Sequence, residues 1–191
     1  MGIHISSGIK KLAHKTSLKR LIFMAMCITI LFVQEQILTI IPNVQFSTLL
    51  IVLYVSLFKW RESVSMIVIY VILDNLYMNS FNPIYTPAML IAWLSIPLVY
   101  HTVLGKTKSE TKLAIFGLLF GFYYGWVFIP FRMFELGITE FWPYLMLDLP
   151  FQIIMAISNF LTILWLYKPL YKTLSHEMEA MGFNQPKTHI E

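Results

Sequence analysis

Six apolar segments separated by short polar stretches constrain the fold of this chain more than any other feature. A helix that spans a bilayer needs roughly 20 mostly apolar residues, with a range of about 17–25. Segments that approach this length cover Leu21 to Ile41, Val44 to Phe58, Val64 to Met78, Pro87 to Val103, Leu113 to Phe131 and Trp142 to Tyr167. The sequence therefore predicts an all-α, polytopic membrane protein built as a six-transmembrane-helix bundle.

The composition excludes a water-soluble domain. Hydrophobic residues make up 58% of the chain and charged residues only 13%, against about 45–50% and about 25% in globular proteins. The one cysteine, Cys27, has no disulfide partner, and the spacing of the five His predicts no metal site. A net charge of +4 is compatible with nucleic-acid binding, but the basic residues sit between apolar runs, where they set topology. We expect the lipid bilayer as a partner, and no nucleic acid.

The distribution of Lys and Arg predicts the orientation. Of 14 such residues, 13 fall in the N-terminus, the second and fourth loops and the C-terminus, and Arg132 alone falls in the opposite loops. Because cytoplasmic loops carry the excess of Lys and Arg, we expect both termini in the cytoplasm. The predicted organisation is a basic cytoplasmic segment over 1–20, a six-helix transmembrane domain over 21–172, and a polar cytoplasmic tail over 173–191, which we expect to fray from Ser175 onward. A signal peptide over 1–41 is rejected, because the apolar run is too long and no cleavage site follows it.

Small residues at helical spacing predict where helices touch. In lipid, close packing depends on small side chains that let two backbones approach. Three stripes have this spacing: Gly117, Gly121 and Gly125 in the fifth segment, Ala88, Ala92 and Ser95 in the fourth, and Ala25 with Thr29 in the first. We expect the glycines to form a tight internal crossing. The other two stripes suit either internal packing or the docking of another membrane protein.

Three carboxylates are expected at one depth, near the outer face. Glu35 follows Leu21 by 14 residues, so it stands roughly 21 Å up a hydrocarbon core about 30 Å thick. Asp74 and Asp148 come out at a similar height. Polar and aromatic side chains predicted near that level are Asn75, Tyr77, Tyr85, Trp142, Gln152 and Asn159. An apolar or aromatic lining with a few placed polar groups is typical of a small-molecule pocket, so these nine residues are the predicted substrate-binding residues.

Each of these residues also has a structural interpretation. Glu35 can reach the interface or bond a neighbouring helix, and Asp74 can cap a helix end. Asp148 can accept a hydrogen bond from backbone that Pro150 frees, and Arg132 can pair with any of the three carboxylates. Trp142 and Tyr144 can be residues of an interfacial aromatic belt. The binding interpretation depends on their convergence at one depth.

The charges of the outer face predict the ligand. Five carboxylates there, set against Arg132, leave an excess of four negative charges, so a polyanion would be repelled. All five His lie at the cytoplasmic side or in the termini, which leaves no imidazole for a transition metal. We expect a neutral or cationic ligand, flat enough to stack on aromatic rings and rich in hydrogen-bond donors.

Catalytic motifs are missing from the sequence. It contains no Gly-x-Ser-x-Gly, no His-Glu-x-x-His and no nucleotide-binding glycine loop. We therefore expect a binding protein that is not an enzyme, with no cofactor. An internal repeat, which many complete secondary transporters show, is not evident either, so we expect another protein to supply the energy.

The chain resembles the substrate-binding membrane subunit, or S component, of energy-coupling factor (ECF) vitamin transporters. The resemblance covers residues 20–172. It rests on six spans in about 190 residues and on short motifs, which are Ile41-Pro42-Asn43-Val44-Gln45, Asn82-Pro83 with Thr86-Pro87, Ala92-Trp93, and Ala156-Ile157-Ser158-Asn159-Phe160.

This resemblance implies a multi-pass subunit of a bacterial plasma membrane that captures a vitamin-like micronutrient at the outer face. It also implies assembly with a membrane coupling subunit and two cytoplasmic ATPases. The family's first helix carries an Ala-x-x-x-Ala pair that docks the coupling subunit; Ala25 and Thr29 match its spacing, with Thr in place of the second Ala. Two alternatives stay open on sequence alone: a membrane assembly or sensory protein without a transported ligand, and a solitary uptake carrier.

Overall fold

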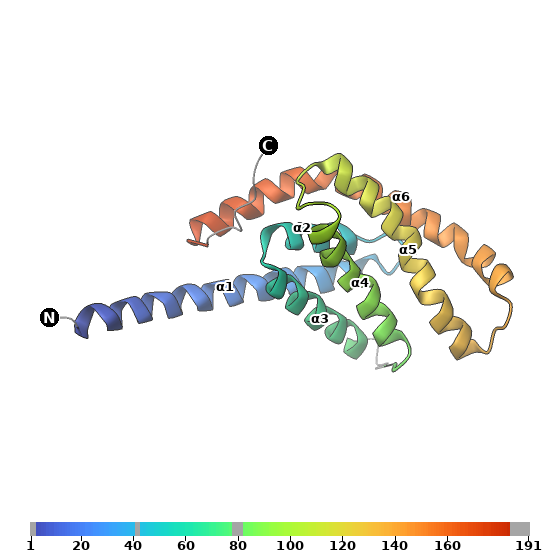
Figure 1. The fold of residues 1–191 in the computed structure, drawn as a ribbon, viewed down its shortest axis with the longest axis horizontal. Helices are drawn as coiled ribbons and strands as arrows, with labels where there is room; N and C mark the ends of the chain where they lie inside the picture. The colour runs from blue at the N-terminus through green and yellow to red at the C-terminus, as the bar shows by residue number, and fades with distance from the viewer. Residues whose placement is uncertain (1–2, 41–42, 78–81, 184–191) are drawn as a thin grey trace.

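A computed structural model describes residues 3–40, 43–77 and 82–183, with side chains from Leu18 onward. Its regular elements within these ranges are all helices, which confirms the all-α class (Figure 1). The six helices are α1 (Ile3–Leu38), α2 (Ser47–Leu57), α3 (Trp60–Tyr77), α4 (Tyr85–Thr102), α5 (Glu110–Leu136) and α6 (Phe141–Ala180). Ile41, Pro42 and Met78, which belong to the predicted spans and first outer turn, lie outside the described residues.

Helix α2 forms the centre of the molecule. All 11 of its residues are buried, and it contacts each of the other helices. At 1.5 Å per residue it is only about 16 Å long, too short to cross a hydrocarbon core of about 30 Å. Gln34 of α1 fixes its first turn: the Gln34 Oε1 accepts from the Phe46 N–H at 3.0 Å, and the Gln34 amide donates to the Ser47 hydroxyl at 2.7 Å.

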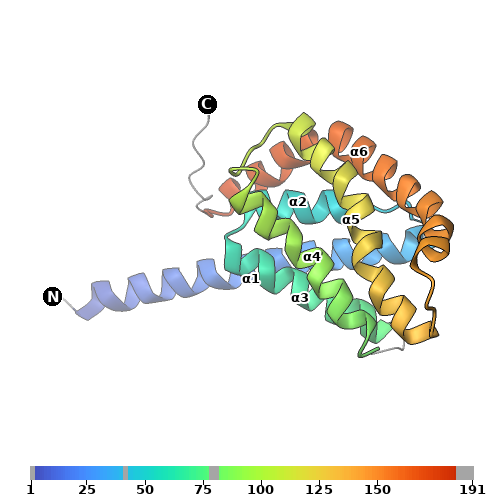
Figure 2. The same cartoon turned by 45° about the vertical axis from the view of Figure 1, so that its right-hand side comes forward.

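Helices α5 and α6 form a tightly crossed pair along one side of the bundle, and α3 and α4 form a second pair (Figure 2). The predicted glycine stripe makes the first crossing. A Cβ atom on Gly121 would lie 2.5 Å from the Cα of Ala156, and one on Gly125 would lie 2.6 Å from the Cγ of Gln152. Because only glycine permits so close an approach, the prediction of a tight internal crossing is confirmed.

Within the part of the chain that the structure describes, three helices are long and apolar enough to span a membrane: α1 over Leu18–Leu38, α5 and α6. They indicate a multi-pass membrane protein. Helices α3 and α4, at 18 residues each, are not among these three, and α3 carries Arg61, Glu62 and Asp74. Their crossing of the membrane, and the full count of six spans, remain predictions.

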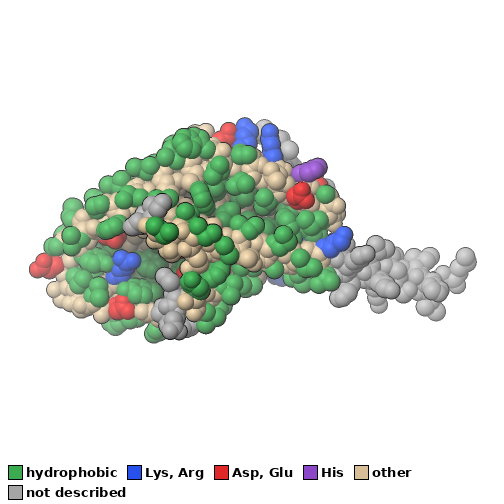
Figure 3. Space-filling view, turned by 180° about the vertical axis from the view of Figure 1, so that it is seen from behind, with side chains coloured by type: hydrophobic (Ala, Val, Ile, Leu, Met, Phe, Trp, Pro, Cys, Tyr) green, Lys and Arg blue, Asp and Glu red, His purple; other side chains and the backbone are tan. Residues whose placement is uncertain are grey.

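On the face shown in Figure 3, charged side chains gather at two opposite ends, and many hydrophobic side chains lie on the surface between them. At what we call the Arg20 end, the Arg20 guanidinium forms a two-bond fork with the Glu62 carboxylate, both bonds being 2.7 Å long, and Lys168 pairs with Glu110 at 3.2 Å. At the opposite, Arg132 end, the Asn82 amide donates to Glu135 at 2.7 Å. Loops that alternate along the sequence are thus sorted to alternate ends, as the charge pattern predicts.

Two helices extend beyond their predicted limits. Helix α1 begins at Ile3, whereas a span from Leu21 was expected. The frayed tail expected from Ser175 is wrong as far as the structure describes it, because α6 continues to Ala180 and Phe183 is buried. The Phe183 ring lies 6.2 Å from the Phe23 ring, and the Arg20 guanidinium stands 5.6 Å above its centroid. These contacts hold the segment after α6 against α1; residues 184–191 lie outside the described residues.

Candidate functional site

A pocket of about 300 Å³ opens at the Arg132 end, between α5 and α6. This volume is at the small end of the range of roughly 300–1,000 Å³ that is usual for small-molecule sites. The lining residues come from both helices and from the loop that joins α1 to α2. They are Asn43, Gly121, Tyr124, Gly125, Phe128, Arg132, Asp148, Phe151, Gln152 and Met155.

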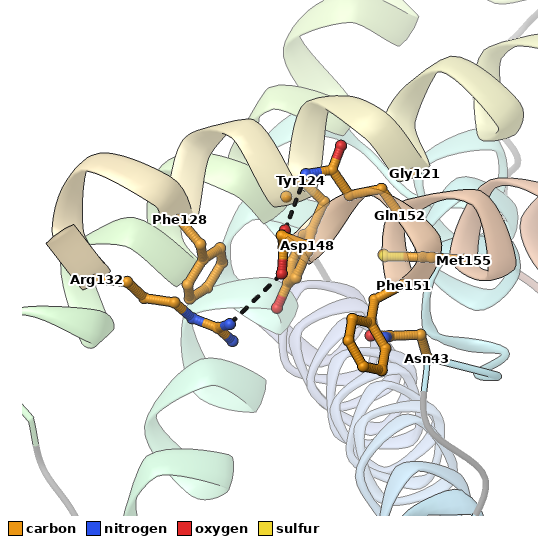
Figure 4. Close-up of a pocket in the computed structure, with 10 residues that line it drawn as sticks. Asn43, Gly121, Tyr124, Phe128, Arg132, Asp148, Phe151, Gln152 and Met155 are labelled. Atoms are coloured by element: carbon orange, nitrogen blue, oxygen red, sulfur yellow. Dashed lines mark hydrogen bonds and ion pairs between the residues drawn. The ribbon is translucent and has the colours of Figure 1, made fainter. Parts of the chain in front are cut away.

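A row of polar groups crosses the pocket (Figure 4). Asp148 lies at its middle: one carboxylate oxygen accepts from the Gln152 amide at 2.8 Å, and the other stands 3.7 Å from the Arg132 guanidinium. Gln152 follows Asp148 by four residues on α6, so the helix itself sets this hydrogen bond. The carbonyl oxygen of Gln152 is buried and has no hydrogen-bond partner in the described structure. The row therefore places the Arg132 donors beside the Asp148 carboxylate, whose other neighbour is the Gln152 amide.

Aromatic rings form the walls of the pocket. The Phe128 ring lies 4.7 Å from the Tyr124 ring and stacks on Tyr85 at 6.3 Å, with an interplanar angle of 29°. Phe151 faces them from α6 in the close-up view (Figure 4). Gly121 and Gly125 also line the pocket, at the place where α5 packs closely against Ala156 and Gln152 of α6.

Asn43 brings the α1–α2 loop to the pocket. Its φ angle of 58° lies in the left-handed region, which asparagine tolerates better than most residues. The turn therefore carries an amide side chain, able both to donate and to accept, to the pocket's edge. The α1–α2 loop therefore contacts the pocket.

A second polar cluster lies between α1, α2 and α3. The Glu35 carboxylate accepts from the Ser47 hydroxyl at 3.3 Å and from the Tyr70 hydroxyl. The Gln36 amide donates to Asp74 at 2.9 Å. Buried carboxylates need such donors, because an unpaired charge in a low-dielectric interior is costly. This arrangement explains how two acidic residues are held inside the bundle.

The structure brings some of the predicted site residues together and separates others. Asp148 and Gln152 line the pocket, and Tyr85 stacks against its wall. Glu35 and Asp74 belong to the second cluster, and Asn75 accepts from the Thr86 hydroxyl at 2.7 Å beside it.

Three predicted residues lie away from the pocket. Tyr77 and Trp142 are 63% and 68% exposed and line none of it. Asn159 is fully buried and donates to the Gly117 carbonyl at 3.2 Å, which places it at the α5–α6 crossing. Tyr77 and Trp142 thus lie on the surface, and Asn159 has a packing position. The part of these three residues in binding stays a prediction.

Sequence reasoning missed several lining residues, namely Asn43, Tyr124, Phe128, Phe151 and Met155. For Tyr124 and Phe128 a signal was present, since they lie three residues from Gly121 and Gly125 on the helix that carries the glycine stripe. Arg132 was expected to pair with one of three carboxylates, and its partner is Asp148.

The pocket is less acidic than the whole outer face. Arg132 and Asp148 are the charged residues among its lining side chains, so their formal charges cancel. Glu135 is engaged by Asn82, and Glu35 and Asp74 are engaged in the second cluster. The excess of four negative charges therefore does not describe the surface that a ligand would contact. Among the described residues, no group of three His, Cys, Asp or Glu side chains could hold a metal ion.

The predicted docking pair is accessible on the surface of α1. Ala25 and Thr29 are exposed, and the Thr29 hydroxyl donates to the Ala25 carbonyl at 2.9 Å, so neither presents an unsatisfied polar group. Neighbouring large apolar residues on this face are also exposed, including Ile22, Met26 and Ile30. Ala88 and Ala92, by contrast, are fully buried, which assigns the α4 stripe to internal packing.

Comparisons with protein-family models, with curated proteins and with solved structures found no match to this chain.

Proposed function

We propose that this chain is the substrate-binding membrane subunit of an ECF-type importer, which captures a vitamin-like small molecule for ATP-driven uptake. In this proposal all six helices belong to the membrane domain, both termini are cytoplasmic, and the Arg132 end faces the outside of a bacterial plasma membrane. The observation that carries it is the pocket at that end, where a polar row of three side chains meets aromatic walls.

The features that support capture are local to the pocket. A binding subunit needs a site that opens on one side only and holds a guest through a few placed polar groups. The pocket lies at one end of the bundle, and α2 fills the centre with residues that are all buried. A continuous channel would need a path through that centre. Capture at one face, followed by energy-driven release, agrees better with this packing.

The accessible face of α1 supports a membrane partner. Helices associate in lipid through small residues that permit close approach, and Ala25 and Thr29 offer such a place on an otherwise apolar, exposed surface. We assign this surface to the coupling subunit, which would in turn contact two cytoplasmic ATPases. The chain itself would bind ligand and hydrolyse no ATP.

Reconstituted uptake tests the proposal. The chain is incorporated into liposomes with and without an ECF coupling subunit and its two ATPases, and accumulation of labelled vitamins is measured with ATP inside. We expect accumulation only with the complete set of subunits and ATP. Uptake by the chain alone would identify a solitary carrier, and complete inactivity with every vitamin would favour an assembly or sensory role; either result would contradict the proposal.

A matched pair of variants separates docking from binding. Ala25→Trp places a large ring on the proposed docking face, and Leu119→Trp places the same ring on α5, where Leu119 is 60% exposed. Ala25→Trp is expected to abolish uptake and to leave equilibrium ligand binding intact, whereas Leu119→Trp should preserve both. Equal uptake by the two variants would exclude Ala25 from the docking surface.

A further inference from the structure

The two Arg–carboxylate pairs that mark the ends of this molecule differ in geometry. Arg20 and Glu62 meet in a closed fork, with both nitrogen–oxygen distances at 2.7 Å. Arg132 and Asp148 stand 3.7 Å apart through a single pair of atoms. Charge-assisted hydrogen bonds close to about 2.7–2.9 Å when nothing prevents it. The pair in the pocket is therefore open where its counterpart is closed.

Neighbouring contacts hold the open pair in place. The Gln152 amide fixes one oxygen of Asp148 at 2.8 Å, and the hydroxyl of Tyr144 lies beside the Arg132 guanidinium. A guanidinium has five N–H groups, more than the contacts to Asp148 and Tyr144 require. The Arg132 side chain is 46% exposed and that of Asp148 is 18% exposed, so both can be reached from the pocket. The N–H donors of Arg132 thus stand beside an acceptor oxygen of Asp148, and a guest can contact both at once.

We propose that this row recognises a planar, neutral molecule whose edge carries an N–H group next to a C=O group, as in a cyclic amide or a cyclic urea. The carbonyl oxygen would accept from Arg132, and the adjacent N–H would donate to Asp148. This inference rests on the proposed function, because it names the chemistry of the ligand that the pocket would capture.

Charge balance favours a neutral edge over an ionic one. An anion bound to Arg132 would also lie beside the Asp148 carboxylate, and like charges within about 4–6 Å repel. A cation bound to Asp148 would meet the same repulsion from Arg132. A neutral donor–acceptor edge gives each charged residue a charge-assisted hydrogen bond and leaves neither charge unpaired in a desolvated site, which would be costly.

The walls select a flat shape. Phe128 and Tyr124 present ring surfaces from α5, and Phe151 presents another from α6. Aromatic rings prefer offset-stacked or edge-to-face partners, so a flat ring placed beside the polar row can stack between these walls. A bicyclic heteroaromatic lactam combines the required edge with such a shape.

The decisive experiment compares four bicyclic probes on the unmodified protein in lipid nanodiscs, with binding measured by isothermal titration calorimetry. The probes are carbostyril, which carries the lactam edge, its O-methyl ether, which lacks the N–H, the quinaldate anion, and an N-methylquinolinium cation. Carbostyril is expected to bind about tenfold or more tightly than each of the others, as a hydrogen bond to a charged group predicts. The proposal would be overturned if the ether, the anion or the cation bound more tightly than carbostyril. It would also be overturned if all four probes bound equally or if carbostyril did not bind.

Variants locate the binding edge. Asp148→Asn should reduce the preference for carbostyril over its ether, and Arg132→Met should weaken the binding of carbostyril itself. Glu140→Gln, at an exposed carboxylate outside the pocket lining, should change neither. A full preference in Asp148→Asn, or unchanged carbostyril binding in Arg132→Met, would contradict the assignment. This test is independent of the uptake assay. Selective lactam binding without ATP-dependent import would support the lactam proposal and contradict the transport proposal. Import without any preference for the lactam would support the transport proposal and contradict the lactam proposal.

Discussion

The α5–α6 crossing gives the sharpest test of the packing. Gly121→Ala adds one methyl group where a Cβ atom would lie 2.5 Å from the Cα and 2.6 Å from the backbone nitrogen of Ala156. Backbone atoms cannot rotate away, so the helices must separate. Overpacking typically costs about 1–3 kcal/mol, and alanine recovers up to about 1 kcal/mol of helix propensity. We expect a net loss of about 2 kcal/mol in the free energy of unfolding.

Gly117→Ala is the matched control one turn away on the same helix. The closest atom to its added Cβ would be the Cδ1 of Ile163, at 2.5 Å, which is the tip of a flexible side chain. A rotamer change there relieves the contact, so the packing cost and the helix-propensity gain nearly cancel. The expected change in the free energy of unfolding is within about 0.5 kcal/mol.

Reversible unfolding in mixed detergent micelles, followed by far-ultraviolet circular dichroism, measures both values. Gly121 also lines the pocket, so its variant should bind ligand more weakly as well. If Gly121→Ala proved as stable as Gly117→Ala, the close approach of α5 and α6 would be refuted.

Three further predictions concern buried and paired groups. Tyr70→Phe removes a donor to the Glu35 carboxylate and should lower the free energy of unfolding by about 1–3 kcal/mol. The control Tyr77→Phe, at a residue that is 63% exposed, should change it by less than about 0.5 kcal/mol. Equal losses for the two variants in micelle unfolding would contradict this prediction. Asn159→Ala removes the hydrogen bond to the Gly117 carbonyl and should lower the free energy of unfolding by about 1–2 kcal/mol while leaving the ligand Kd unchanged. A raised Kd with an unchanged free energy of unfolding would show that Asn159 binds the ligand. Glu62→Gln breaks the two-bond fork with Arg20 and should lower the free energy of unfolding by about 1–2 kcal/mol. Glu110→Gln, whose partner Lys168 is 62% exposed, should lower it by less than about 0.5 kcal/mol. A larger loss for Glu110→Gln than for Glu62→Gln would exclude a stabilising role for the Arg20–Glu62 fork.

Position along a helix could be predicted from the sequence, because each residue adds a fixed rise of 1.5 Å. The placement of Asp148 and Gln152 near the end that carries Arg132 follows from this, and so does the sorting of the loops. The glycine stripe was predictable for a related reason, since a spacing of four residues keeps all three glycines on one face.

Position around a helix was not predictable in the same way. Segments that are apolar on nearly every side give no polar face from which to read direction. Glu35 and Asp148 are expected at similar depth, yet Glu35 faces the second polar cluster and Asp148 faces the pocket. Tyr77 and Trp142 lie on the exposed surface. The pairing of Arg132 with Asp148 required the tertiary structure, because three carboxylates were equivalent candidates by depth.

The C-terminal extension of α6 was missed for a different reason. Its polar composition suggested fraying, but a few apolar residues at suitable positions are enough to dock a helix end. Met178 and Phe183 are buried, and the Phe183 ring meets Phe23 and Arg20. A distant contact of this kind is not visible in local composition.

Equilibrium binding to the purified protein in nanodiscs, measured by calorimetry across a vitamin panel, tests the central claim most directly. We predict that at least one vitamin binds saturably, and that about 100 times its Kd raises the free energy of unfolding by about 2.7 kcal/mol. Asp148→Asn should abolish this binding, and Glu140→Gln should retain it. Binding by no vitamin, or undiminished binding to Asp148→Asn, would contradict a ligand site between α5 and α6.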